Sequence, residues 1–175
     1  VQHGHLEEVG YDTYCRILDE VLKEEQGIAV EEEINCQIDL NVTSYIPDSY
    51  IEDQNQKIEI YQDIALCKNE EDIRNVIDEI IDRFGNMPNE IENLIEISRI
   101  KQLAKKQYLT KIQSRKDSVV FTYDVNKFDN NKVPELIKKY GSKIQFSSGL
   151  KPMITLKIDK NGEKALLQEV KEFLK

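Results

Sequence analysis

Carboxylate side chains are the groups of this sequence whose spacing best suits a binding site. Over residues 70–84, a turn of about 100° per residue places the isoleucine, valine and phenylalanine side chains in one stripe. The opposite side carries Glu71, Asp72, Asn75, Asp78, Glu79 and Asp82. Glu79 and Asp82 are neighbours on the helix surface, where like charges destabilise an isolated helix by about 0.2–0.5 kcal/mol. Such a cost suits a patch that meets arginine or lysine on a partner, and it is also small enough for an ordinary solvated helix face.

Metal and thiol chemistry is not expected from the remaining reactive side chains. His3 and His5 are the two histidines, and no third ligand accompanies them in the sequence. The cysteines Cys15, Cys36 and Cys67 are odd in number, far apart and without a C-x-x-C pair. This pattern fits neither a disulfide framework nor a zinc site, so we expect reduced cysteines and no metal site.

Catalytic and cofactor motifs are absent from the sequence. It has no G-x-x-x-x-G-K-[ST], no G-x-G-x-x-G and no G-x-S-x-G pattern. We therefore expect neither a catalytic site nor a cofactor site in this chain. A small hydrolase built on surface carboxylates is a weaker alternative, because it requires a concave cluster of perturbed acids. No apolar run approaches the roughly 18 residues of a membrane span, so no membrane partner is expected. The reduced cysteines favour a cytoplasmic protein.

Charge is divided unevenly along the chain. Residues 1–100 hold 25 acidic and 7 basic side chains, whereas residues 101–175 hold 8 acidic and 17 basic ones. The first part should repel DNA, because phosphate binding depends on lysine and arginine. The second part would attract an acidic surface, or the two parts simply offset one another in the fold. A nucleic-acid-binding accessory domain that uses the basic segment 101–175 is the alternative that this asymmetry leaves open.

The elements that position these residues begin with helices and one strand. Periodicity predicts a helix over 11–26 and, from strict alternation, a strand with one buried face over 34–42. A helix is expected over 53–68, with Ile58, Tyr61, Ile64, Ala65 and Cys67 turned inward. Another is expected over 70–84, between the N-cap Asn69 and Gly85. Pro88 then opens a helix that extends to about residue 107.

The second half of the chain has more expected strands than the first. Strands are expected over 109–115, 118–123, 143–147 and 153–159, with helices over 131–140 and 162–174. Because helices and strands are grouped more than alternated, the fold class is expected to be α+β, a helical group packed with a small mostly antiparallel sheet. The segment near 27–33 is the best candidate for a domain boundary.

Four phrases of the sequence resemble the transcription-repair coupling factor family. They are residues 2–14 (QHGHLEEVGYDTY), 46–51 (IPDSYI), 53–61 (DQNQKIEIY) and 81–85 (IDRFG) followed by Pro88. Three positions depart from the family pattern. His3 replaces the usual serine, Glu52 a frequent proline, and Lys57 the usual arginine, which puts a bidentate carboxylate contact at that position in doubt.

The resemblance implies a function that composition alone does not give. Members of the family displace RNA polymerase stalled at damaged DNA and then recruit the excision-repair protein UvrA. An upstream motor binds ATP and magnesium and translocates on DNA. The C-terminal domain docks on the N-terminal UvrB-like module, masks the UvrA-binding surface and restrains the translocase. By this resemblance, residues 1–28 are the tail of the motor region and residues 29–175 are a non-catalytic C-terminal regulatory domain.

The resemblance also selects the docking residues. The family's contact with the UvrB-like module uses acids on the helix that leads into the D-R-F-G phrase, and these positions match Glu79 and Asp82. Asp78 and Asn75 complete the expected interface on the same helix face. Arg83 flanks this surface and either joins the interface or pairs locally. The intramolecular partner is expected to be the UvrB-like module, and Phe84 is expected in the core.

Overall fold

The computed structural model describes residues 35–175, together with Cys15, Ile17, Leu18, Glu20, Val21 and Glu24. The expected boundary between residues 28 and 29 lies outside the described residues, as does most of the helix expected over 11–26. The chain divides into two compact units. We call the described residues 42–99 the helical unit, and residues 35–41 with 100–175 the sheet unit. No described helix is both long and apolar enough to span a membrane.

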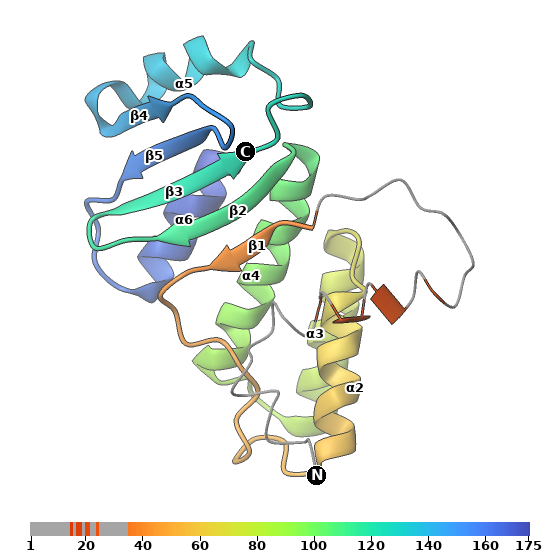
Figure 1. Cartoon of the computed structure of the whole chain (residues 1–175). Helices are drawn as coiled ribbons and strands as arrows, with labels where there is room; N and C mark the ends of the chain where they lie inside the picture. The colour runs from red at the N-terminus through yellow and green to blue at the C-terminus, as the bar shows by residue number, and fades with distance from the viewer. Residues whose placement is uncertain (1–14, 16, 19, 22–23, 25–34) are drawn as a thin grey trace. The chain divides into compact units, whose positions relative to one another are not determined.

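Three helices form most of the helical unit (Figure 1). They are α2 (Gln54–Ala65), α3 (Glu70–Phe84) and α4 (Asn89–Lys106), and the last turns of α4, from Ile100 on, belong to the sheet unit. The side chain of Asp53 caps α2 by accepting the Gln56 N–H over 2.9 Å. Asn69 caps α3 in the same way, accepting the Asp72 N–H over 2.9 Å. Helix α3 ends at Gly85, whose φ of 90° is not helical. Glycine suits this position because a residue with a Cβ rarely adopts this conformation.

The core of the helical unit gathers isoleucine, leucine and tyrosine side chains. Its fully or almost fully buried members include Ile46, Ile51, Ile60, Tyr61, Ile64, Ile73, Ile80, Ile91 and Leu94. The segment before α2 is tied to this core, since the N–H of Ile46 donates to the hydroxyl of Tyr61 over 2.8 Å. The ammonium group of Lys57, a buried residue, contacts the carboxylate of Asp48. Polar contacts therefore fix the 46–51 phrase against α2.

Besides the short 3₁₀-helix Gly141–Lys143, the sheet unit contains five strands and two α-helices of its own. In chain order these are β1 (Gln37–Asp39), β2 (Leu109–Ser114), β3 (Ser118–Tyr123), α5 (Lys132–Tyr140), β4 (Ile144–Ser147), β5 (Met153–Lys157) and α6 (Glu163–Leu174). The strand order is β1-β2-β3-β5-β4. The pair β1–β2 is parallel and the other pairs are antiparallel. The expected α+β class with a mostly antiparallel sheet is confirmed.

Helix α6 covers one face of this sheet (Figure 1). Ile112, Phe121 and Ile154 stand in register across β2, β3 and β5, and all three are fully buried. The ring of Phe121 stacks on that of Phe173 in α6, with centroids 4.2 Å apart. Within the described sheet unit no helix lies over the opposite face, which is turned toward the viewer.

Several expectations from the sequence need correction in detail. The alternating burial of Cys36, Ile38 and Leu40 is confirmed, but the regular strand has only three residues, Gln37–Asp39. Helix α2 ends at Ala65 rather than near residue 68. Cys15, Cys36 and Cys67 are thiols, as expected.

The inward faces of α2 and α3 also differ from expectation. Lys57 and Ile60 turn into the core of the helical unit, while Ile58, Ala65 and Cys67 are half-buried. Ile81 is 43% exposed, because the centre of the α3 contact lies along Ile73 and Ile80. Phe84 is half-buried at the helix end, beside the ring of Tyr50.

Candidate interaction surface on α2 and α3

The five residues expected to form an interface all stand exposed on α3. They are Asn75, Asp78, Glu79, Asp82 and Arg83. Their spacing of three and four residues places them on one side of the helix, opposite the buried Ile73 and Ile80. No buried carboxylate occurs among them, so the acidic side of α3 faces solvent within the helical unit. Whether this side binds a partner stays a prediction.

Arg83 pairs locally in this structure. Its Nη1 atom lies 3.0 Å from Oε1 of Glu79, one turn earlier on α3, and 3.3 Å from Oε1 of Glu59 on α2. The guanidinium also lies over the ring of Phe84, 4.9 Å from its centroid. The hydrogen bond to Glu79 is the largest cause that raises the pKa of Arg83. Because these ion pairs are exposed to water, each contributes little to stability and can be exchanged for a partner at low cost.

Asp82, Asp78 and Asn75 have no such local pairing. Among the described residues, neither Asp82 nor Asp78 has a basic group within ion-pair distance, and Asn75 has no side-chain hydrogen bond. Each of these exposed carboxylates can therefore accept a bidentate guanidinium contact. Among the five expected interface residues, Asp82 and Asp78 are the carboxylates that a partner can reach without displacing an internal contact.

A cluster of three carboxylates lies where α2 meets α3. Glu59, Asp63 and Glu79 each offer an oxygen within 4.8 Å of the other two. Burial raises the pKa of Asp63, the charges of Glu79 and Glu59 raise it further, and Arg83 opposes them. The geometry would admit a cation, but Arg83 already supplies a positive charge to two of the three groups. The cluster extends the acidic surface of α3 onto α2.

The C-terminal end of α3 is held by Tyr50. Its hydroxyl donates a hydrogen bond to the carbonyl of Gly85, and its ring centroid lies 6.0 Å from that of Phe84. Burial raises the pKa of this phenol, which favours the protonated form that donates the hydrogen bond. The contact fixes the turn that directly follows Asp82 and Arg83.

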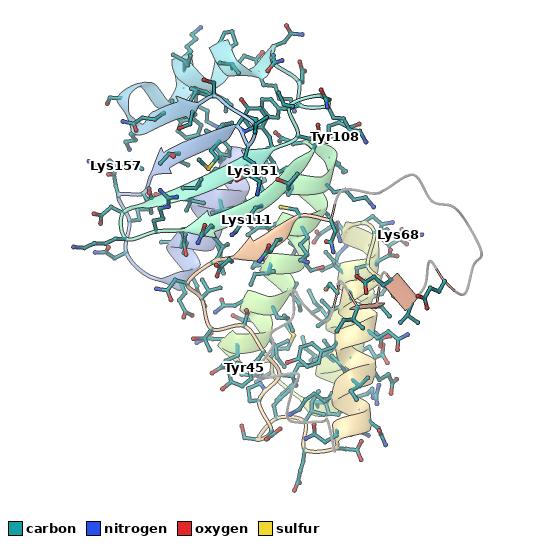
Figure 2. All side chains as sticks on the ribbon, viewed as in Figure 1. Tyr45, Lys68, Tyr108, Lys111, Lys151 and Lys157 are labelled. Atoms are coloured by element: carbon teal, nitrogen blue, oxygen red, sulfur yellow. The ribbon has the colours of Figure 1, made fainter. Side chains whose placement is uncertain are left out.

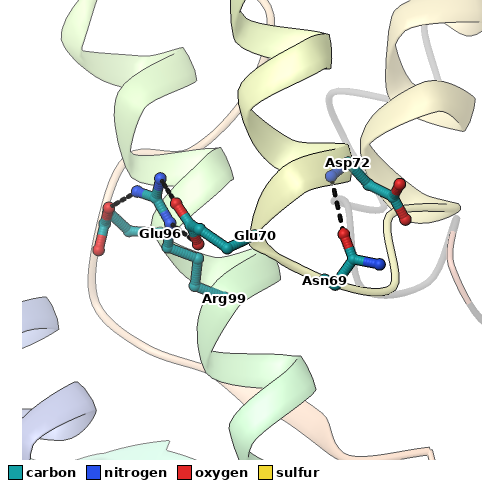
Figure 3. Close-up of polar contacts among 5 residues, drawn as sticks. All are labelled: Asn69, Glu70, Asp72, Glu96 and Arg99. Carbon is teal, nitrogen blue, oxygen red and sulfur yellow. Dashed lines mark hydrogen bonds and ion pairs between the residues drawn. The ribbon is translucent and has the colours of Figure 1, made fainter.

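The N-terminal end of α3 is held by Arg99 of α4 (Figure 3). Arg99 makes a forked contact with Glu70, with Nη2 at 2.7 Å from Oε1 and Nε at 3.1 Å from Oε2. The same guanidinium contacts the carboxylate of Glu96, one turn earlier on α4. Since both ends are anchored by polar contacts, α3 presents its outer side chains from a fixed backbone.

Comparison with known proteins identifies the family. Residues 40–133 match the sequence model of a family described as the TRCF domain. This match covers α2, α3, α4, β2 and β3, and therefore includes the whole acidic surface. The chain belongs to the TRCF domain family.

Relatives of this TRCF domain carry the name transcription-repair-coupling factor. The chain is 35% identical over 147 residues to the protein of Bacillus subtilis (strain 168), an alignment that covers 82% of this chain and 12% of the relative. It is 31% identical over 176 residues to the protein of Rickettsia prowazekii (strain Madrid E), covering 99% of this chain and 15% of the relative. The TRCF domain thus spans a small part of these longer proteins.

The fold of this TRCF domain has a solved counterpart. A crystal structure of the C-terminal domain of a transcription-repair coupling factor superposes with a TM-score of 0.71 and 22% sequence identity. The superposition covers 79% of this chain and 89% of that one. It shows the same α+β fold, and with the family match it confirms the expected resemblance.

Two acidic residues of this TRCF domain's surface are not predicted from the sequence. Glu59 and Asp63 lie on α2, and they reach Glu79 only because α2 and α3 pack side by side. Their spacing of four residues, next to the inward positions Ile60 and Ile64, was the available signal. Helical periodicity within 70–84 does not indicate which residues of another helix lie beside Glu79.

Proposed function

We propose that this TRCF domain is a non-catalytic regulatory domain of a transcription-repair coupling factor. Its acidic surface, formed by Asp78, Glu79 and Asp82 of α3 with Glu59 of α2, docks on a basic surface of the UvrB-like N-terminal module. Docking masks the surface to which UvrA binds and restrains the DNA translocase. The observation that supports this best is that Asp82 and Asp78 stand exposed without a basic partner, on a helix anchored at both ends.

The proposed clamp depends on modest contacts made within one polypeptide. Because domain and module are tethered, the second surface is present at high effective concentration, and a weak interface stays closed. Each charge-assisted hydrogen bond contributes about 1.5–3 kcal/mol when solvent is excluded. Losing two or three of them when the motor moves is sufficient to shift a balanced equilibrium toward the open state.

Other features of the proposal concern the full-length protein. ATP and magnesium bind the upstream motor, of which residues 1–28 are the tail, and residues 29–175 form the regulatory domain. RNA polymerase, UvrA and DNA are partners of the full-length protein and reach this domain indirectly. The protein acts in the cytoplasm without a membrane partner. The length of the relatives, of which this chain matches 12–15%, leaves room for the motor and the UvrB-like module.

The test uses full-length protein carrying Glu79→Ala with Asp82→Ala. Removing both carboxylates opens the clamp, and we expect the affinity for UvrA to rise about fivefold or more. The matched control is Glu52→Ala with Glu135→Ala, which removes two exposed acids from other parts of the domain. Circular dichroism confirms that both variants are folded.

Binding of the isolated domain to the separated UvrB-like module completes the test. A pull-down should weaken at high salt and be lost in the Glu79→Ala, Asp82→Ala variant, because the contact is between opposite charges. Unchanged UvrA affinity in a folded variant, or a pull-down insensitive to both salt and substitution, would count against the docking role.

A further inference from the structure

The uncovered face of the sheet contains a hollow. Its volume is about 490 Å³, and its lining includes Lys111, Val120, Val125, Leu150, Lys151 and Met153. Strands β2, β3 and β5 form the floor, and the segments after β3 and before β5 form one side. Lys111 and Lys151 lie on the sheet face turned toward the viewer (Figure 2). All the residues that line the hollow belong to the sheet unit.

Strand register explains why these side chains meet there. Lys111, Thr122 and Met153 stand in register across β2, β3 and β5, and Gln113, Val120 and Thr155 form the next row. Because side chains alternate between the two faces of a sheet, both rows point away from α6. A register shift between Leu109 and Lys111 interrupts β2 at this end. Bulges of this kind re-aim side chains and bend the strand.

The rim of the hollow carries exposed apolar side chains. Leu150 is 100% exposed and Val125 is 56% exposed, whereas Val120 on the floor is only 3% exposed. Gly149 positions Leu150 at the turn between β4 and β5, since its φ of 141° is rarely adopted by L side chains. Large apolar side chains held out beside a concave surface are typical of protein interaction sites.

The charge of the hollow is positive. Among the described residues, neither Lys111 nor Lys151 has a carboxylate within ion-pair distance. Asp124 is the one acid in the lining, and its Oδ1 atom already accepts the N–H of Asn126 over 2.8 Å. Residues 101–175 carry 17 basic and 8 acidic side chains, so the field around the hollow also favours an anionic ligand.

A peptide fits a hollow with positive charge and an apolar rim better than a nucleic acid does. Stacking of single-stranded bases requires exposed aromatic rings, and no aromatic residue stands in the two floor rows. Tyr123 lines the hollow, but its ring packs against that of Phe128, with ring centroids 4.3 Å apart. A DNA duplex would meet the lysines but has no side chain to fill an apolar hollow. An acidic peptide with one large apolar side chain satisfies both features.

We propose that this hollow binds a peptide segment in which acidic residues flank a large apolar anchor. The anchor side chain lies between Leu150 and Val125 over the floor, and the flanking carboxylates meet the ammonium groups of Lys111 and Lys151. The occupant belongs to a partner protein, and this binding is separate from docking through α3. Anchors of this kind contribute most of the energy of small interfaces, whereas the charges direct association.

The experiment titrates the ¹⁵N-labelled 175-residue chain with a synthetic octapeptide of six acidic residues around a central Leu-Phe pair. We expect chemical-shift changes confined to β2, β3, β5 and the turn at Gly149. Lys111→Glu with Lys151→Glu should weaken binding about tenfold or more through charge reversal. The matched control, Lys138→Glu with Lys160→Glu, makes the same charge change at exposed lysines outside the hollow and should leave affinity within about twofold.

Two further ligands distinguish the proposed peptide from other occupants of the hollow. The octapeptide with Ser-Ser in place of Leu-Phe should bind about tenfold more weakly, because it loses the buried anchor. Single-stranded and duplex DNA at physiological salt should not produce the same shifts. The proposal is overturned by tighter binding of DNA, by equal binding of the serine peptide, or by shifts that map outside the hollow. Self-association that Lys111→Glu with Lys151→Glu abolishes would also overturn it, by assigning the hollow to a second copy.

Discussion

The hydroxyl group of Tyr50 donates a hydrogen bond of 2.5 Å to the carbonyl oxygen of Gly85. This contact joins the 46–51 phrase, which precedes α2, to the turn that ends α3. Two of the phrases by which the chain resembles its family therefore meet in space, 35 residues apart in sequence. Their meeting point lies next to Arg83 and Asp82, the last charged residues of the proposed docking surface.

Tyr50→Phe should destabilise the helical unit and loosen the end of α3. The substitution leaves the Gly85 carbonyl without its donor, and the loss expected for one such hydrogen bond is about 0.5–1.5 kcal/mol. Urea denaturation followed by circular dichroism measures the change. Tyr45→Phe is the matched control, since the Tyr45 hydroxyl has no hydrogen-bond partner among the described residues. Equal stability of the two variants would show that the contact contributes nothing.

Arg83→Gln should strengthen docking on the UvrB-like module. Removing the guanidinium frees Glu79 and Glu59, with which it pairs at 3.0 and 3.3 Å, and makes the surface more negative. We expect the pull-down to retain more of the module and the full-length protein to bind UvrA more weakly.

Arg74→Gln is the control for this experiment. Arg74 is an exposed arginine of the same helix with no ion pair among the described residues. If Arg83→Gln instead weakens the pull-down, Arg83 contacts the module directly and is part of the interface. The two interpretations of Arg83 that the sequence left open thus predict opposite signs.

Asp63→Asn should stabilise the domain at neutral pH. The folded state raises the pKa of Asp63 above the value of 3.8, so the folded state binds this proton more tightly than the unfolded state does. The stability that this group contributes is therefore lost as pH rises from its pKa in the unfolded state through its higher pKa in the folded state. The stability gained by Asp63→Asn, measured by thermal unfolding, should grow between about pH 4 and pH 7. Asp78→Asn removes an exposed acid of α3 and serves as the control; a pH-independent gain would contradict the argument.

Cys67 should react slowly with alkylating reagents. Burial, followed by the charges of Asp72 and Asp63, raises the pKa of this thiol from 9.0 to about 11. Because the thiolate is the nucleophile, its fraction near pH 8 falls about 100-fold. Iodoacetamide labelling read by peptide mass spectrometry should show this retardation relative to the urea-unfolded chain. Equal rates in the two states would exclude it.

Much of the fold follows from local signals in the sequence. Helix α3 begins after Asn69 and ends at Gly85 as expected, because a side-chain cap and a residue free to adopt positive φ act on their immediate neighbours. Strand β3 occupies the expected residues, Ser118–Tyr123, for a similarly local reason, its high content of strand-forming side chains.

Features set by contacts between elements could not be read in this way. Lys57 is buried in place of Ile58 because its aliphatic stem lies in the core while its ammonium reaches Asp48, nine residues earlier. Glu59 and Asp63 joined the acidic surface only through the packing of α2 against α3. The hollow depends on the register of β2, β3 and β5, which alternation within one strand does not specify.

Arg99 limits how the proposed clamp can open. Its forked grip on Glu70 secures the first turn of α3 to α4, while the last turn is secured at Gly85. Fraying of α3 from either end is therefore suppressed, and release has to move the helix as an intact rod. Its amide protons would stay protected from hydrogen exchange in the masked and unmasked states alike. The proposed switch therefore changes the partner contacts of α3 and leaves the helix folded.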